Sequence, residues 1–174
     1  MELIKADVSE AKRAYRRLEE SFPPEERRPF ADFCRVWEDA RFSLFFAREG
    51  GEEVGLISLW QFSDFVFVEH LAVYPEQRGG GYGGKIMRAV AAAHPALVLE
   101  IEPPTEGDKL RRWEFYRRLG FVMNDFPYFQ PAYSAGGEKL EMRLLSLPMP
   151  LKNPEKAIGE IYRAVYGIES EREA

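Results

Sequence analysis

Residues 73–84, VYPEQRGGGYGG, organise the sequence around them. They follow an apolar run from Phe65 to Tyr74 that is typical of a strand, and they precede a helical pattern from Lys85 to His94. Glycines at the start of a helix expose backbone N–H groups which, with the positive end of the helix dipole, suit a diphosphate. Because ordering five glycines costs conformational entropy, a purely structural turn would use fewer. The stretch therefore predicts a phosphate cradle, assisted by Arg78.

A dinucleotide site is a second interpretation of the same glycines. Gly79, Gly81 and Gly84 form a literal G-x-G-x-x-G, with the acidic Glu100 at the end of the next predicted strand. However, Pro75 to Arg78 separate the first strand from the first glycine, whereas a dinucleotide turn leaves its strand directly. The rest of the chain also lacks regularly alternating strands and helices. A dinucleotide-binding oxidoreductase therefore remains only a third alternative.

The elements around the glycine cluster predict an α/β (α+β) fold. Two helices, from Glu10 to Ser21 and from Phe30 to Trp37, come first. The predicted strands are 3–5, 42–47, 54–62, 65–74, 97–101, 121–123 and 140–147, and the later helices are 85–94, 108–119 with Asp108 as cap, and one opened by Asn153-Pro154. The expected sheet is mixed and mostly antiparallel, is flanked by helices and has one parallel crossover at the glycine cluster.

Composition sets limits on the class of protein. The chain has 174 residues, with 24 Lys+Arg against 29 Asp+Glu, and its net charge of -5 disfavours a nucleic-acid partner. A single cysteine, Cys34, excludes an internal disulfide, and no ligand spacing suggests a metal site. No apolar stretch predicts a signal or a membrane span, so we expect a cytoplasmic protein. We expect one domain over 1–174, with a helical substrate-side segment 1–40, a core 41–147 and an additional C-terminal helix 151–168.

Two motifs resemble the GNAT superfamily of N-acetyltransferases. Arg78, Gly81 and Gly83 fill the family's acyl-CoA signature, [Q/R]-x-x-G-x-[G/A], after an apolar strand. Residues 115–121, FYRRLGF, are similar to the family's segment in which a tyrosine precedes a Leu-Gly-Phe turn. The resemblance covers about residues 41–147. Many members have Asn and Ala where this chain has Lys109 and Arg112.

The resemblance implies direct transfer of an acetyl group from acetyl-CoA, as cosubstrate, to a primary amine of an unidentified small molecule or peptide. It implies that Tyr116 is the general acid for the departing thiolate. The implied cofactor-binding residues are the strand backbone at Leu71, Ala72 and Val73, the side chain of Arg78, and the amides of Gly79, Gly80, Gly81, Tyr82, Gly83 and Gly84. The alternative function is that of a non-catalytic acyl-CoA-binding module. The resemblance is also compatible with a homodimer.

A general base has three candidates, and a reaction without a protein base also stays open. Glu69 and His70 interrupt an apolar strand. Since adjacent strand residues point to opposite faces, we expect at most one of the two side chains to face the acetyl group. By the same alternation Glu69 should share its face with Phe67 and Leu71. Glu100 resembles the base of the family's peptide-acetylating branch. The irregular segment after residue 123 supplies further pocket candidates: Tyr128, Gln130 and Tyr133.

Overall fold

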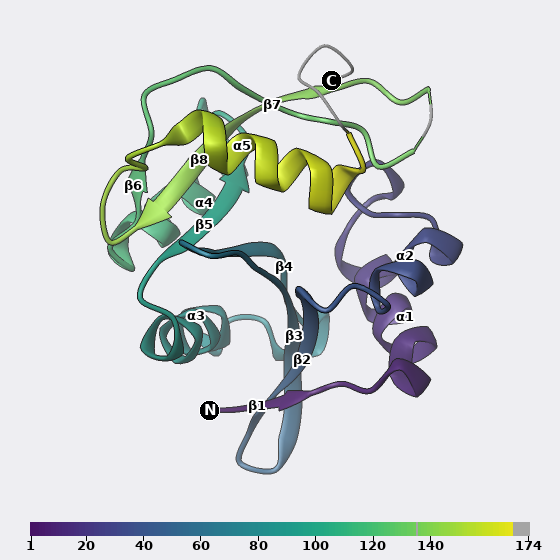
Figure 1. The fold of residues 1–174 in the computed structure, drawn as a ribbon. Helices are drawn as coiled ribbons and strands as arrows, with labels where there is room; N and C mark the ends of the chain where they lie inside the picture. Colours follow the sequence, from purple (N-terminus) through teal and green to yellow (C-terminus); the bar gives the residue numbers. More distant parts are fainter. Residues whose placement is uncertain (135, 169–174) are drawn as a thin grey trace.

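A computed structural model describes residues 1–134 and 136–168 (Figure 1). The main sheet has the strand order β1-β2-β3-β4-β5-β8-β6, and β7 pairs with β8. The strands are β1 Glu2–Lys5, β2 Phe42–Glu49, β3 Glu52–Gln61, β4 Val66–Val73, β5 Leu97–Ile101, β6 Val122–Met123, β7 Tyr128–Gln130 and β8 Leu140–Leu147. Within the described residues only β4 and β5 run parallel, as the strand, helix, strand order around the glycines predicts. The predicted fold class is confirmed.

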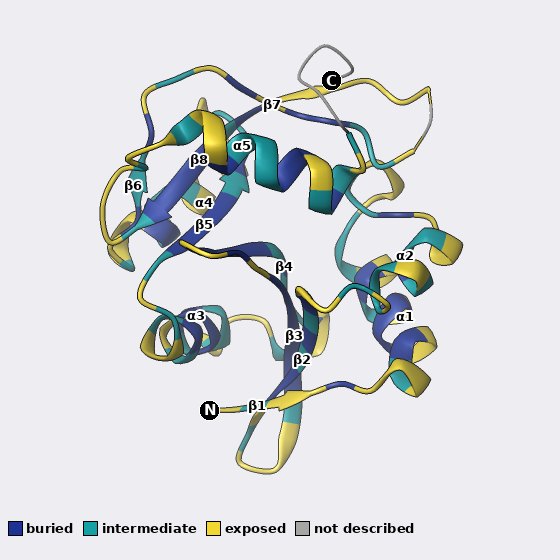
Figure 2. Ribbon diagram, viewed as in Figure 1, coloured by how far each residue is buried: buried dark blue, intermediate teal, exposed yellow. Residues whose placement is uncertain are grey.

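Helices cover both faces of the sheet (Figure 1). They are α1 Ala11–Ser21, α2 Phe30–Val36, α3 Tyr82–Ala93, α4 Gly107–Arg118 and α5 Pro154–Ile161, with short turns η1 Val8–Glu10, η2 Pro24–Glu26, η3 Pro75–Gln77 and the π-helical turn η4 Tyr162–Tyr166. One apolar core joins α1, α2 and α5 to one sheet face, and a second joins α3 and α4 to the other. Figure 2 shows β3, β4 and β5 as largely buried strands between these layers.

Helix ends agree with the sequence at most positions. Asn153 caps α5 through a bond from the Lys156 N–H, and Gly120 follows α4 with a φ of 92°. The predicted cap at Asp108 is wrong: the helix begins at Gly107, which adopts a φ of 55°, so the cap position falls two residues earlier, at Glu106. α3 begins at Tyr82 rather than Lys85, so the last three residues of the glycine cluster form its first turn.

A β-bulge in β4 changes which residues share a face. Ser58 of β3 pairs with His70 and Leu59 pairs with Val68, which leaves Glu69 without a partner in β3. Glu69 and His70 consequently both point toward the core of α1 and α2, while Leu71 packs in the opposite core. The prediction that Glu69 and His70 point to opposite faces, and that Glu69 shares a face with Leu71, is therefore wrong.

A gap opens between the two parallel strands. β4 and β5 pair at only three positions, the last being Val68 with Leu99, and then diverge. Beyond this point β4 keeps its pairing with β3 on one side only, since Tyr74 donates its N–H to the Val54 carbonyl. This gap leads toward the glycine cluster, which follows β4 and opens α3.

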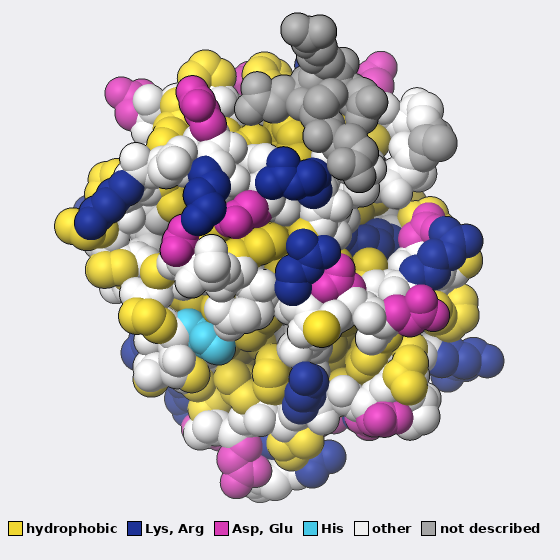
Figure 3. Space-filling model, viewed as in Figure 1, with side chains coloured by type: hydrophobic (Ala, Val, Ile, Leu, Met, Phe, Trp, Pro, Cys, Tyr) yellow, Lys and Arg dark blue, Asp and Glu magenta, His cyan; other side chains and the backbone are white. Residues whose placement is uncertain are grey.

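The surface carries mixed charges. Figure 3 shows basic and acidic side chains interspersed on the face that it presents. Of the helices in the described part of the chain, none has both the length and the apolar character needed to cross a membrane.

Candidate active site

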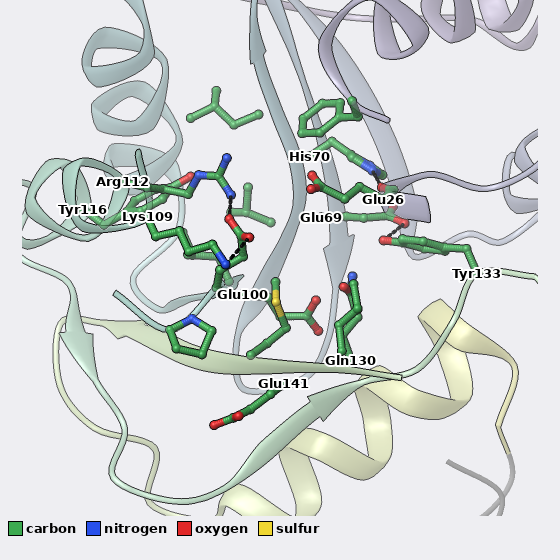
Figure 4. Close-up of a pocket in the computed structure, with 18 residues that line it drawn as sticks. Glu26, Glu69, His70, Glu100, Lys109, Arg112, Tyr116, Gln130, Tyr133 and Glu141 are labelled. Carbon is green, nitrogen blue, oxygen red and sulfur yellow. Dashed lines mark hydrogen bonds and ion pairs between the residues drawn. The ribbon is translucent and has the colours of Figure 1, made fainter. Parts of the chain in front are cut away.

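A cavity of about 270 Å³ lies where β4 and β5 diverge, and it brings the catalytic candidates together. Glu69 and His70 come from β4, Glu100 from β5 and Tyr116 from α4. Figure 4 shows Lys109, Arg112 and Tyr116 on one side of the cavity and Glu26, Glu69, His70 and Tyr133 on the other. Gln130 and Tyr133 also line the cavity; Tyr128 does not, but it reaches Glu100 from β7.

Glu100 is a buried carboxyl group held by tyrosine hydroxyls. Tyr128 donates to its Oε1, and Tyr166 donates to its Oε2 at 2.8 Å. No basic side chain of the described residues forms an ion pair with it. Burial raises the pKa of Glu100 to about 7, against the opposing effect of the two hydroxyl donors and of the Arg28 charge. A carboxyl group with this pKa can accept a proton near neutral pH.

Glu69 lines the same cavity but has very different partners. Its Oε1 pairs with the Arg28 guanidinium and accepts the Tyr133 hydroxyl at 3.2 Å, while its Oε2 accepts the Trp60 indole N–H at 2.8 Å. The side chains of Arg28 and Glu69 are 6% and 1% exposed, so this is a buried ion pair. A cation and two further donors thus occupy both oxygens of the Glu69 carboxylate.

His70 is a neutral, fully engaged imidazole. Its Nε2 lies 3.0 Å from the carbonyl oxygen of Glu26, and its Nδ1 lies 3.3 Å from the Ser58 hydroxyl. Burial lowers the pKa of His70 to about 4. The Nε2 proton is therefore assigned as the donor to the Glu26 carbonyl, and both ring nitrogens have partners within the protein.

Tyr116 lies at the end of α4, with its ring against Phe121 at a centroid distance of 5.5 Å. Burial raises the pKa of Tyr116 to about 12, so the phenol is protonated at neutral pH and can donate. Nearer the start of α4, Lys109 and Arg112 pair with Glu102 at 3.2 Å and 3.1 Å at the edge of the cavity. The two residues that depart from the family motif thus form one ion-pair cluster.

The glycine cluster borders a separate, more open cavity of about 650 Å³. The lining residues that carry its chemistry are Arg78, Gly79, Gly81, Tyr82, Gly83, Gly84, Arg88 and Arg118. Gly81 caps α3 at a φ of 70°, and the first helical bond runs from the Lys85 N–H, so the preceding three amides have no helical acceptor. Gly80 does not line this cavity and faces the Tyr82 ring. Open amides, a helix N-terminus and three arginines fit a diphosphate.

The β4 backbone connects the two cavities. Ala72 pairs with Leu56, and its carbonyl lies against Gly55 of β3. Because backbone groups alternate along a strand, those of Leu71 and Val73 point into the gap. The sequence-based assignment of Ala72 to the ligand-facing backbone is therefore corrected: its N–H and C=O groups belong to the β3 pairing.

Three contributors were not identified from the sequence. Arg28 pairs with Glu69, Trp60 donates to the same carboxylate, and Tyr166 donates to Glu100. Arg28 occurs in a charged turn, Trp60 in an apolar strand and Tyr166 in an amphipathic helix. None of these settings carries a local signal of a site: the Arg28 and Tyr166 contacts join segments distant in the chain, and the Trp60 contact depends on how β3 pairs with β4.

Comparison with known proteins gives consistent results. The family model described as "Acetyltransferase (GNAT) domain" matches residues 40–123. A curated relative from Bacillus subtilis (strain 168), "Putative acetyltransferase YjbC", is 31% identical over 109 residues, which make up 62% of this chain and 55% of that protein. The chain thus spans just over half of that relative's length.

Solved structures extend the similarity over nearly the whole chain. A "Putative acetyltransferase from GNAT family from Bacteroides thetaiotaomicron" is 30% identical, with a TM-score of 0.90 and coverage of 97% of this chain and 99% of that one. The ribosomal-protein-S18-alanine N-acetyltransferase from Escherichia coli is 16% identical, with a TM-score of 0.64 and coverage of 86% and 94%. The second likeness is one of fold alone.

Proposed function

The chain belongs to the GNAT acetyltransferase family, and on that premise we propose that it moves an acetyl group from acetyl-CoA to a primary amine of a small molecule or peptide. One observation carries the proposal: the gap between β4 and β5 joins an amide cradle suited to a diphosphate to a cavity that holds Glu100, to which no described residue offers an ion pair. The two cavities would serve the donor and the acceptor.

Donor binding would use backbone groups and arginines. The amides that open α3, with Arg78, would hold the diphosphate, and the outward groups of Leu71 and Val73 would bind the arm along β4. Acetyl-CoA supplies a thioester, whose carbonyl carbon is open to attack by an amine. Hydrogen bonds from β4 to the carbonyl oxygen would stabilise the negative charge that develops there.

The acid and base roles would fall to Tyr116 and Glu100. As the amine nitrogen bonds to the acetyl carbon and the carbon–sulfur bond breaks, the nitrogen proton passes to Glu100. Tyr116 donates its proton to the departing sulfur and recovers one from solvent, and Glu100 releases the proton that it took up to solvent. Glu69 and His70, which are engaged by Arg28, Trp60, Ser58 and Glu26, would shape the cavity rather than carry protons.

Ligand-dependent thermal unfolding tests the donor half. The protein is unfolded with acetyl-CoA, CoA, NAD or FAD in separate samples. A ligand at 100 times its Kd adds about 2.7 kcal/mol to the free energy of unfolding and raises the midpoint by several degrees. We expect shifts with acetyl-CoA and CoA alone. A shift with NAD or FAD and none with CoA would support the dinucleotide alternative instead.

Release of the CoA thiol in the presence of an amine panel tests the acceptor half. The panel should hold small diamines, amino sugars and lysine-containing or free-N-terminal peptides. We expect at least one amine to accelerate thiol release, with a matching acetylated product by mass spectrometry. Binding of acetyl-CoA with no acceptor above the hydrolysis background would favour a non-catalytic acyl-CoA-binding module.

A further inference from the structure

The C-terminal segment lies outside residues 40–123, which match the family model, and it contacts Glu100 and Gln130, two residues that line the candidate active-site cavity. After α5 the chain makes the π-helical turn η4, in which the N–H groups of Gly167 and Ile168 both turn back to the Tyr162 carbonyl. Turns of this type are rare and frequently occur at functional sites, because they redirect the side chains that follow. Here the last residue of the turn is Tyr166.

Three bonds attach this turn to the site. The Tyr166 hydroxyl donates to Glu100 at 2.8 Å and accepts the Gln130 side-chain amide at 2.9 Å. The Val165 carbonyl accepts one nitrogen of the Arg28 guanidinium, whose other terminal nitrogen pairs with Glu69. One buried arginine therefore links the C-terminal turn to β4, and one tyrosine links the turn to β5.

We propose that this turn completes the acid–base site, with Tyr166 as a positioning residue that holds the Glu100 carboxyl group toward the acceptor amine. The inference rests on the proposed function, in which Glu100 is the base. Tyr128 and Tyr166 each bond a different oxygen of Glu100, so together they fix the rotation of the carboxyl plane. Each oxygen keeps further acceptor capacity for the proton of the amine.

Several charged or titratable groups surround Glu100. They are Tyr128 from β7, Tyr133 from the following loop, Tyr166 from η4, Arg28 from the segment before α2, and Glu69 and His70 across the cavity on β4. The two hydroxyl donors and Arg28 stabilise the ionised form against burial. Removing the Tyr166 hydroxyl should therefore raise the pKa of Glu100, by about one unit for one bond to a charged group.

Titration of Glu100 in the full chain tests the inference. Carbon-13 NMR of labelled glutamate carboxyls follows the group directly, and Glu100→Gln identifies its signal. With Tyr166→Phe we expect the midpoint to rise by about one pH unit and the acid limb of kcat/KM to move with it. Activity well below the midpoint should fall about tenfold, and the high-pH plateau should change much less. Tyr128→Phe should shift the midpoint in the same direction.

Tyr162→Phe is the matched control, since its hydroxyl is in the same turn but donates to the Phe129 carbonyl. No shift with Tyr166→Phe, or an equal shift with Tyr162→Phe, would overturn the inference. Because the NMR titration needs no substrate, a protein that shifts as expected but acetylates no amine would refute the proposed function and leave the contact between Tyr166 and Glu100 intact.

Discussion

The two ends of the gap between β4 and β5 are built in opposite ways. The cradle end uses backbone amides and Arg78 from one continuous stretch, with Arg88 of α3 and Arg118 of α4 beside them, and Gly79, Gly80 and Gly81 are exposed. The acid–base end uses buried side chains from at least five separate segments. Backbone groups at a helix start point outward whatever the rest of the fold does, whereas a buried carboxyl group needs partners positioned by the whole molecule.

Within the acid–base end, the two glutamates Glu69 and Glu100 line one cavity but have different partners. Glu69 is neutralised by Arg28, and Glu100 is held by Tyr128 and Tyr166. A cation favours the ionised form strongly, whereas neutral hydroxyls only moderate the effect of burial. The same residue type therefore suits structure at one position and proton transfer at the other.

Replacing the proposed base should have the largest effect. Glu100→Gln keeps the shape and one oxygen that can accept a tyrosine hydroxyl, but its amide nitrogen accepts neither a second hydroxyl nor a proton, so we expect kcat/KM to fall by about 10² to 10⁴. Thiol release measures the loss, and thermal unfolding checks the fold. Glu141→Gln, on β8 at the same cavity, is the control and should retain activity. A loss below tenfold for Glu100→Gln would eliminate Glu100 as the base.

Breaking the buried ion pair between Arg28 and Glu69 should lower the stability of the fold. Arg28→Met leaves Glu69 buried without its cation, which should lower the free energy of unfolding by about 3–5 kcal/mol. Urea denaturation measures the change. The double variant Arg28→Met/Glu69→Leu should recover part of the loss, because it removes the unpaired charge. A single-variant cost near zero would mean that the pair does not organise this end of the gap.

Tyr116→Phe removes the proposed acid while keeping the ring against Phe121. We expect kcat to fall by about 10² with KM little changed, since the proton is needed only as the sulfur leaves. An acetyl thioester of a more acidic thiol that binds the same site should show a smaller loss, because its leaving group needs less protonation. Equal losses with both donors would argue for a packing role.

The smallest effect belongs to the cradle end. At Gly83 an added methyl group would lie 3.4 Å from Phe115, an ordinary contact, so Gly83→Ala should leave the apo protein as stable or about 1 kcal/mol more stable. It should weaken CoA binding about tenfold, because the methyl group obstructs one amide. Calorimetric titration gives the Kd. Gly50→Ala, in the β2–β3 turn at a φ of 61°, should lose stability without changing the Kd.

Sequence patterns predicted most elements and the parallel crossover, and the two motifs predicted the family; the phosphate cradle stays a prediction. They failed at the β4 bulge, because a bulge depends on how β3 pairs with β4. They named Glu69, Glu100 and Tyr116 but could not rank the two glutamates. The partners that separate them are remote in the chain: Arg28 is 41 residues from Glu69, and Tyr166 is 66 residues from Glu100.

Local chemistry was thus enough for the features that neighbouring residues build. Glycines that open a helix, a proline after a cap and alternating apolar residues act over a few positions, so the open amides at the start of α3 and the order of elements follow from the chain alone. Only the tertiary structure decides which buried glutamate pairs with an arginine and which is held by tyrosine hydroxyls. Burial and charge pairing depend on contacts across the whole fold, and those contacts set the pKa of Glu100.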